Sequence, residues 1–256
     1  MKRRAAYLYC SRVKAVCLLV GILVCLPGPY SAKPKESADG LMIKHALAPF
    51  AGRSIDGIFI YLDQIRPAPV KDSDKALLLQ ETPLATGEAA VRDPKQLAML
   101  KKRIRPALAL HRRITLADFY IFHFPYPVAT NKPGALIGIS TTMLGLIGDD
   151  DSALIGIMSH ELAHEYVAMQ MVDAYLNHDL TRQRELELFC DAVAVATLIA
   201  LNLDPAKYAS VLERGVNFSP EVAKLNNGER DMPNISLRKR LIFEFSAELL
   251  RTQAER

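Results

Sequence analysis

Apolar residues at helical spacing dominate the second half of the chain. Acids and a serine at positions 149–152 favour a helix start, because free N–H groups and the helix dipole attract such side chains. We expect this helix to run to about Leu176 and a second to span roughly residues 181–201. The Asp-Pro pair at 204–205 is typical of the start of a third helix, and a last helix is predicted from Ser236. The apolar stripe of that last helix consists of Leu237, Leu241, Ile242, Phe245 and Leu249.

The first half of the chain predicts fewer elements. A helix is expected over residues 94–113, although Pro106 could kink it. Residues 119–124 and 134–140 are rich in apolar and aromatic side chains and predict two strands. Residues 58–62 fit either a strand or a short buried segment.

These elements predict one domain that follows a short leader. Residues 33–256 are expected to form a single α+β domain that is mainly helical, with a small β-sheet next to the long helix. Residues 126–256 carry the best-defined elements, whereas residues 33–125 are only sparsely assigned. No internal repeat with a period of about 20–50 residues is present, so the sequence gives no support to a solenoid.

The first 32 residues have the pattern of a targeting segment. A basic start precedes the apolar run 15–26, which proline and glycine then interrupt. This run is shorter than the roughly 20 residues that cross a bilayer as a helix, which favours a cleaved signal over an anchor. We therefore predict a signal peptide or an N-terminal membrane anchor, and an exported protein that is periplasmic or associated with the membrane through this segment.

Charge and cysteine usage agree with this interpretation. The net charge is +4, and the leader alone carries five basic residues and no acid, which leaves −1 for the remainder. The positive charge thus belongs to the leader, and we expect no nucleic-acid partner. Cys190 is the only cysteine after residue 32, so an intramolecular disulfide is excluded in a chain that has lost the leader.

The sequence His160-Glu161-Leu162-Ala163-His164 predicts a metal site. Four residues of helix advance about 6 Å and return nearly to the same face, so both imidazoles can bind one ion. Zinc accepts such nitrogens, and Glu161, one step around the helix, can take a proton from water and pass it to a leaving group. An exposed helix with two unrelated histidines is a poorer explanation, because apolar residues surround the motif. We predict one zinc ion held by His160 and His164, with Glu161 as the catalytic residue.

A catalytic zinc needs a third protein ligand and one open position. Glu187 and Asp191 lie four residues apart on one face of the next predicted helix. We predict that Glu187 binds the metal while Asp191 accepts a hydrogen bond from a metal-bound imidazole. Glu185 lies about 160° around the helix from Glu187, so both cannot serve. The other acidic or histidine candidates downstream are Asp173, His178 and Asp179.

Four segments of the chain resemble the HtpX-like family of gluzincin peptidases, which includes the CAAX prenyl proteases. Residues 134–144 and 159–165 are similar to the family's strand, short helix and metal motif. Residues 187–192 resemble its Glu-x-x-Ala-Asp segment, with Cys190 in place of the alanine. Residues 233–238 are similar to its late Pro-x-x-x-x-Arg signature. The likeness covers about residues 130–243.

The resemblance implies a zincin fold of the gluzincin type and a zinc metalloendopeptidase. Its substrates would be peptide bonds of exported or membrane-associated proteins, hydrolysed with Glu161 as the group that activates water. It also implies that the strand near residues 136–140 pairs with an extended substrate by edge addition. Proteolysis of a protein or peptide substrate is therefore an expectation from the family, whereas metal-assisted hydrolysis follows from the motif itself.

Two departures from the family pattern leave other interpretations open. Met232 stands where the family commonly has a histidine before the late proline, and methionine cannot donate a hydrogen bond. Arg238 or Tyr166 would then have to stabilise the transition state, or the chain is a degenerate binding or chaperone-like module that keeps its zinc. Only 22 residues separate His164 from Glu187, which is fewer than usual in the family. A cytosolic zinc peptidase that cleaves a regulatory partner is the remaining alternative.

Overall fold

The computed structural model describes residues 37–68, 71, 73, 90–91, 93–113, 117–132, 134, 136–226 and 232–255. The predicted leader, residues 1–32, lies outside these described residues. Ala38–Arg256 form one compact unit. Within the described ranges, no helix combines the length and the apolar composition needed to cross a membrane.

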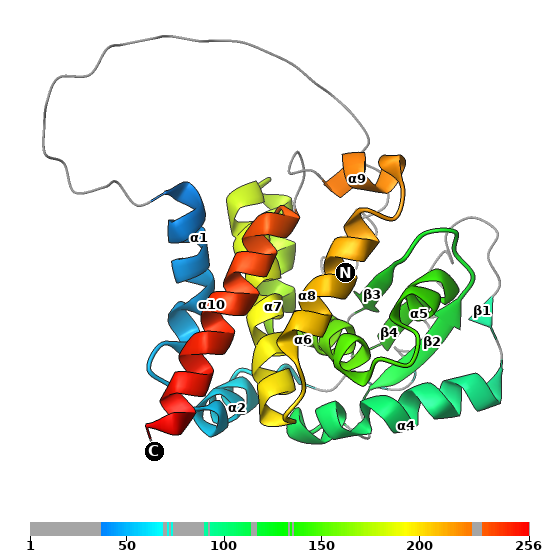
Figure 1. The fold of residues 1–256 in the computed structure, drawn as a ribbon, viewed down its shortest axis with the longest axis horizontal. Coiled ribbons are helices and arrows are strands. Elements are labelled where there is room, and N and C mark those ends of the chain that lie inside the picture. Colours follow the sequence, from blue (N-terminus) through cyan, green and yellow to red (C-terminus); the bar gives the residue numbers. More distant parts are fainter. Residues whose placement is uncertain are drawn as a thin grey trace, which may run out of the picture. The chain divides into compact units, whose positions relative to one another are not determined.

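The described chain is mainly helical with one small mixed sheet, which confirms the predicted balance of elements (Figure 1). The two long helices predicted on either side of residue 178 and the last helix are confirmed as α6, α7 and α10. The helices are α1 Ala38–Leu47, the 3-10 helix η3 Ala48–Phe50, α2 Ile55–Gln64, α4 Pro94–Leu110, α5 Thr141–Ile147, α6 Asp151–Leu176, α7 Leu180–Ala200, α8 Pro205–Val216, α9 Pro220–Asn226 and α10 Ile235–Ala254.

The sheet has the strand order β1-β2-β4-β3. Its strands are β1 Ala90–Val91, β2 Asp118–Phe122, β3 Ala129–Lys132 and β4 Leu136–Ser140. β2 and β4 are parallel, whereas the β1–β2 and β3–β4 pairs are antiparallel. β4 therefore has a partner on each side and no free edge. The expectation that β4 pairs with an extended substrate is wrong, and β3 is the outer strand on that side.

Residues 58–62 are helical, so the strand alternative for this segment is wrong. Ser54 caps α2, because its hydroxyl accepts a hydrogen bond from the Gly57 N–H at 3.1 Å. Ile58 and Leu62, one helical turn apart, then point together into the core, where both are fully buried. The apolar run is thus the buried stripe of a short helix. Pro106 lies inside α4, which nevertheless continues to Leu110.

α6 and α7 form a helical hairpin with a tight turn. Asp150 caps α6 by accepting from the Ala153 N–H at 3.0 Å, and Asp179 caps α7 by accepting from the Arg182 N–H at 2.9 Å. Between the two helices, His178 adopts a left-handed backbone with φ 54°, which reverses the chain within three residues. Two aspartate caps and this turn fix where each helix begins, and with it the register of every side chain on both helices.

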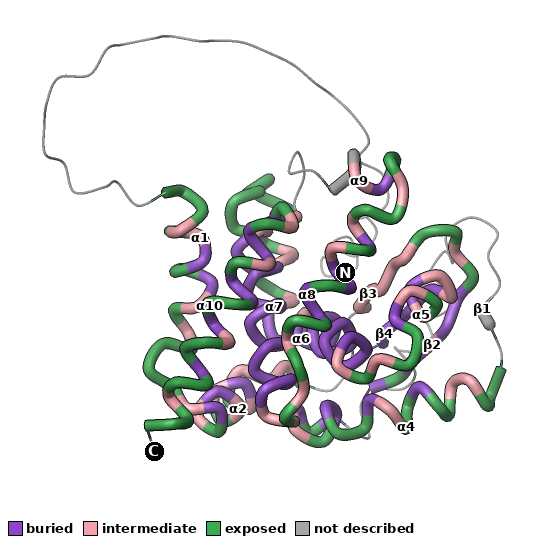
Figure 2. The backbone as a smooth tube through the Cα atoms, in the orientation of Figure 1, coloured by how far each residue is buried: buried purple, intermediate pink, exposed green. Residues whose placement is uncertain are grey.

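α7 lies at the centre of the helical layer. Every residue from Glu185 to Ile199 is buried, and Figure 2 shows this helix as a nearly continuous buried segment. α1, α6 and α10 all pack against it. The Phe50 ring stacks on Phe189 of α7 at 5.0 Å and lies 5.8 Å from the Phe245 ring of α10. Side chains on α7 are therefore held in a rigid setting, because neighbouring helices enclose it over most of its length.

Candidate metal centre

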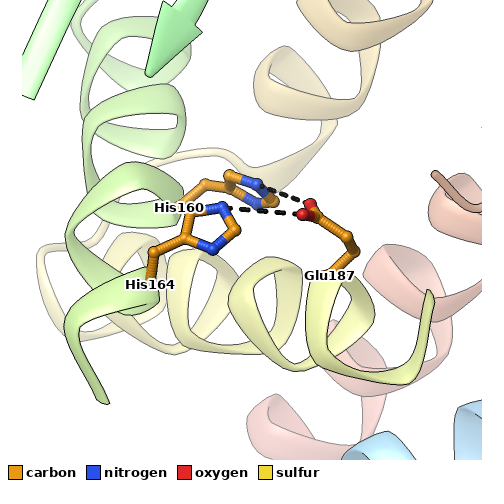
Figure 3. A group of neighbouring side chains, drawn as sticks. All are labelled: His160, His164 and Glu187. Carbon is orange, nitrogen blue, oxygen red and sulfur yellow. Dashed lines mark ion pairs between the residues drawn. The ribbon is translucent and has the colours of Figure 1, made fainter. Parts of the chain in front are cut away.

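The structure brings the three predicted metal ligands together. His160 and His164 project from α6 toward Glu187 on α7, and one donor atom from each lies within 4.8 Å of the other two (Figure 3). His160 and Glu187 are buried, and the His164 side chain is 19% exposed. The hairpin therefore forms a small group of donors that is open to solvent mainly at His164.

The distances within this group suit a metal ion. Nε2 of His160 lies 3.3 Å from Oε2 of Glu187, and Nε2 of His164 lies 3.8 Å from Oε1. Two donors bound to one tetrahedral zinc at about 2.0–2.2 Å lie about 3.3–3.6 Å from each other, so the first pair fits directly and the second is slightly wider. Oε2 of Glu187 is also buried without a hydrogen-bond partner, because its approach to His160 lacks the alignment of a hydrogen bond. Such an orphaned carboxylate oxygen fits a cation placed between the donors.

The electrostatic environment favours positive charge at this position. Burial alone would lower the pKa of His160, but the hydrogen bond to Asp191 and the nearby carboxylate of Glu187 outweigh it and raise the pKa to about 9. Burial would likewise raise the pKa of Glu187, yet the charges of His164 and His160 lower it. The carboxylate of Glu187 thus stays ionised. The surrounding negative charge stabilises a cation bound to the imidazole of His160, whether that cation is a proton or a metal ion.

Glu161 differs from Glu187 in its titration. Burial, the largest influence, raises the pKa of Glu161, and the charges of His164 and His160 offset this only in part. Glu161 is absent from the three-residue donor group, although it is adjacent to His160 on α6. A buried carboxylate with a raised pKa, next to a metal position but not facing it as a ligand, is suited to accept a proton from water.

Asp191 anchors His160 from behind. Its Oδ1 accepts a hydrogen bond from Nδ1 of His160 at 2.9 Å, as the four-residue spacing from Glu187 predicts. Arg238 of α10 donates two hydrogen bonds to the same carboxylate, from Nε to Oδ2 at 2.8 Å and from Nη2 to Oδ1 at 2.6 Å. The charge of this arginine holds the pKa of Asp191 far below its usual range despite complete burial. An ionised Asp191 keeps the proton of His160 on Nδ1 and leaves Nε2 free to bind a metal.

Tyr208 of α8 belongs to the same network, and the sequence did not predict it. Its hydroxyl donates to Oδ1 of Asp191 at 2.6 Å and lies 3.2 Å from Nδ1 of His160. Its ring packs against Gly156, where an added Cβ would come within 2.6 Å of the ring carbons. A glycine one turn before His160, within the otherwise apolar run 153–158, was the available signal of a close packing partner.

His164 has a weaker partner than His160. Its Nδ1 lies 3.6 Å from Sγ of Cys190 on α7. Burial, followed by the negative charges of Glu187 and Asp191, raises the pKa of Cys190 well above its usual value. Cys190 therefore stays a neutral thiol and behaves as a small buried residue. It contacts Nδ1 of His164, whereas Nε2 of the same ring faces Glu187.

Arg238 and Tyr166 are both engaged elsewhere. Arg238 is bound to Asp191 behind His160, and the Tyr166 hydroxyl lies 2.9 Å from Nδ1 of His111. The second ring nitrogen of His111, Nε2, lies 2.9 Å from the hydroxyl of Thr197. His111 therefore links Tyr166 of α6 to Thr197 of α7 at a place separate from the donor group. Neither side chain is placed among the three ligands, where transition-state stabilisation would need it.

The remaining ligand candidates lie outside the donor group. Asp173 and His178 are exposed near the hairpin turn, and Asp179 caps α7. Glu185 pairs with His45 of α1 at 2.8 Å through Oε1 and with Arg182 at 3.1 Å through Oε2. Its side chain thus points toward α1, whereas that of Glu187 points toward α6, as their helical spacing predicts.

No protein-family model matches this chain, and a search of the curated proteins returns no match. The resemblance to HtpX-like gluzincins rests on the sequence motifs alone and stays a prediction. The fold and the arrangement of the donor group are independent of it.

Replacing Tyr208 with phenylalanine should weaken metal binding without unfolding the protein. The ring would still fill the space beside Gly156, but Asp191 would lose a hydrogen bond of 2.6 Å and hold His160 less firmly. Loss of a group that orients a ligand typically lowers metal affinity by about 10–100-fold. We expect a decrease near 10-fold, because the Tyr208 hydroxyl makes only one of several hydrogen bonds to Asp191. A competition titration against a zinc chelator measures the change, with Tyr126→Phe as the control, because Tyr126 is 37% exposed and its ring packs against Phe124. An affinity equal to wild type would show that the hydroxyl plays no part in orienting His160.

Proposed function

We propose that this chain is an exported zinc-dependent endopeptidase with a gluzincin-type zincin domain. The observation that carries the proposal is the geometry of the donor group: two imidazole nitrogens and one carboxylate converge beside a buried glutamate that does not join them. Two histidines and a glutamate are the ligand set of one class of catalytic zinc sites, which keep a further position open. The partial exposure of His164 supports such an open position.

The ligand chemistry favours zinc. His160, His164 and Glu187 offer nitrogen and oxygen donors whose separations, 3.3 Å and 3.8 Å, are close to those around a tetrahedral ion. When bound, zinc supplies Lewis acidity at this position. Sites for magnesium or calcium are instead built from oxygen donors, so the paired imidazoles argue against these ions.

The residues around the donor group have separate roles in the proposed reaction. Glu161 takes a proton from a water molecule and passes it to the leaving amine, a task for which its raised pKa suits it. Asp191, held by Arg238 and Tyr208, keeps the Nδ1 proton of His160 in place. The ligands are thereby oriented before substrate arrives, so little reorganisation is needed during the reaction.

A peptide substrate is supported by the position of β3. β3 is the outer strand of the sheet, and α6 packs against it. An extended chain that added to the outer edge of β3 would run beside the helix that carries Glu161. The proposed substrate is therefore an extended segment of a protein, which is consistent with a peptidase of exported or membrane-associated proteins.

A non-catalytic zinc-binding module is the second candidate. Arg238 and Tyr166 are bound to Asp191 and His111, and Met232 cannot donate a hydrogen bond. None of these three residues is thus placed to donate a hydrogen bond to the transition state. A module that keeps the metal for structure would show the same ligands and the same buried network.

One experiment separates these two functions. Purified protein should contain about one zinc per chain and cleave casein, because the ligand set is complete. Dialysis against a chelator should abolish cleavage, and added zinc should restore it. Stoichiometric zinc without cleavage would favour the binding module. Protein that neither contains zinc nor takes it up would contradict both functions.

A further inference from the structure

Large apolar side chains are exposed at one end of the helical layer. On the α6–α7 hairpin, Met169 is 72% exposed and Leu176 is 60% exposed. Met169 and Leu176 are seven residues apart, so they lie on the same face of α6. Tyr175 and Leu180, on either side of the hairpin turn, are exposed as well. We call Met169, Tyr175, Leu176 and Leu180 the apolar tip.

The start of α1 lies at the same end. His45 pairs with Glu185 at 2.8 Å, and Phe50 stacks on Phe189, so α1 and α7 run in the same direction. The first turn of α1, with its exposed Leu41, therefore lies near the first turn of α7. Figure 1 shows the beginning of α1 and the turn between α6 and α7 at the same end of the helices.

The apolar tip does not line the metal site. Met169 is five residues after His164 and Leu176 is twelve residues after it, which places them about 140° and about 120° around the axis of α6. The imidazole of His164 faces Glu187, whereas Met169 and Leu176 lie on another side of α6. Tyr175 is only about 20° from His164 around the axis, but it lies eleven residues, about 16 Å, farther along the helix. A partner that covers the tip thus leaves the donor group accessible.

We propose that the apolar tip lies in the interfacial layer of a lipid bilayer, and that the leader follows the anchor alternative given above and is retained in the same bilayer. The compact unit begins at Ala38, the first residue of α1, at this same end. Eleven residues, 27–37, join it to the apolar run 15–26, and they reach at most about 36–40 Å. Leucine, methionine and tyrosine suit this layer, because tyrosine combines an apolar ring with a polar hydroxyl.

Charge at the tip is balanced. Asp173 and Asp179 are accompanied by Arg182 and Arg184, so neither sign dominates near the turn. Binding by the tip should therefore depend on apolar burial, and it should change little between neutral and anionic lipids.

The chain contains no tryptophan, so a single introduced tryptophan reports on one position. We would place Leu176→Trp in the full chain and mix it with phosphatidylcholine vesicles whose acyl chains are brominated. The expected result is a shift of emission to shorter wavelength and loss of most of the intensity, because the indole enters the bilayer near the bromine atoms. Circular dichroism checks the fold, which an exposed position should leave intact.

Met99→Trp is the matched control. Met99 is 57% exposed on α4, and α4 is fixed to the start of α6 by Arg103, whose Nε lies 2.6 Å from Asp151. α6 has 26 residues and is about 39 Å long, so the control reports from its opposite end. Its emission should stay that of an indole in water even though the same leader is present.

A third variant separates insertion of the tip from mere proximity to the membrane. Adding Met169→Asp and Leu180→Asp to Leu176→Trp should return the emission toward that of an indole in water on the same vesicles. Equal quenching at positions 176 and 99, or none at 176, would overturn the proposal. So would a short emission wavelength at 176 without vesicles, since a second copy of the chain or the leader itself would then cover the tip.

Discussion

Glu187→Ala should remove most of the bound zinc, whereas Glu185→Ala should retain it. Glu187 supplies the only carboxylate of the donor group, with its oxygens 3.3 Å and 3.8 Å from the two imidazoles. Loss of a group that merely orients a ligand weakens metal binding by about 10–100-fold, so loss of a ligand should exceed about 100-fold. The measurement is metal analysis after dialysis against a mild chelator.

Glu185 provides a control on the same helix. It is buried like Glu187, but its oxygens contact His45 and Arg182 instead of the imidazoles. Its loss should loosen the contact between α1 and α7 and leave the metal in place. Circular dichroism on both variants excludes unfolding as the cause of metal loss. Zinc lost from Glu185→Ala and kept by Glu187→Ala would show that the ligand assignment on α7 is wrong.

Glu161→Gln should abolish peptide hydrolysis while zinc content stays near the wild-type value. Glutamine keeps the shape of the side chain but cannot accept the proton of a water molecule. Loss of a general base typically lowers kcat by about 10²–10⁴-fold. Because Glu161 stands outside the donor group, its replacement should leave the ligands intact. Casein cleavage and metal analysis on the same preparation measure both quantities.

His160→Ala is the reference for this experiment, since it removes a ligand and should lose both zinc and activity. Zinc loss in Glu161→Gln as severe as in His160→Ala would show that Glu161 binds the metal. Full activity in Glu161→Gln with zinc retained would assign the proton transfer to another group. Either outcome would require a different mechanism from the one proposed.

The sequence predicted the parts of the site that depend on local helical geometry. The spacing of His160 and His164 places them on one face, and the four-residue spacing on α7 separates the roles of Glu187 and Asp191. The acids and serine at positions 149–152 allowed the start of α6 to be located in advance, and Asp150 is its cap. Asp179, the cap of α7, was considered only as a possible ligand. Each of these inferences requires only the period of a helix and the preferences of its ends.

The parts that were missed depend on contacts between distant segments. Tyr208 and Arg238 reach Asp191 from α8 and α10, and nothing in the spacing of either helix shows which neighbour it meets. The sequence shows that Arg238 carries a positive charge but not that Asp191 is its partner, so a role in catalysis remained open for it. The interior position of β4 likewise follows from the strand order, which short apolar runs do not determine. Residues 58–62 were ambiguous because a short apolar run fits a strand or a helix equally well.

The short α6–α7 turn has a consequence for the order in which the protein acquires its metal. His160 and Glu187 are only 27 positions apart, and a turn of three residues brings their helices together. Contacts this local form early in folding, before the strands of the sheet find partners. If the site binds zinc as proposed, we expect the hairpin alone to bind the ion in a nascent chain, and the bound ion to stabilise that hairpin by mass action. Tyr208 and Arg238 would join later, when α8 and α10 pack. By fixing Asp191 and so His160, they would raise the affinity of the site for the ion.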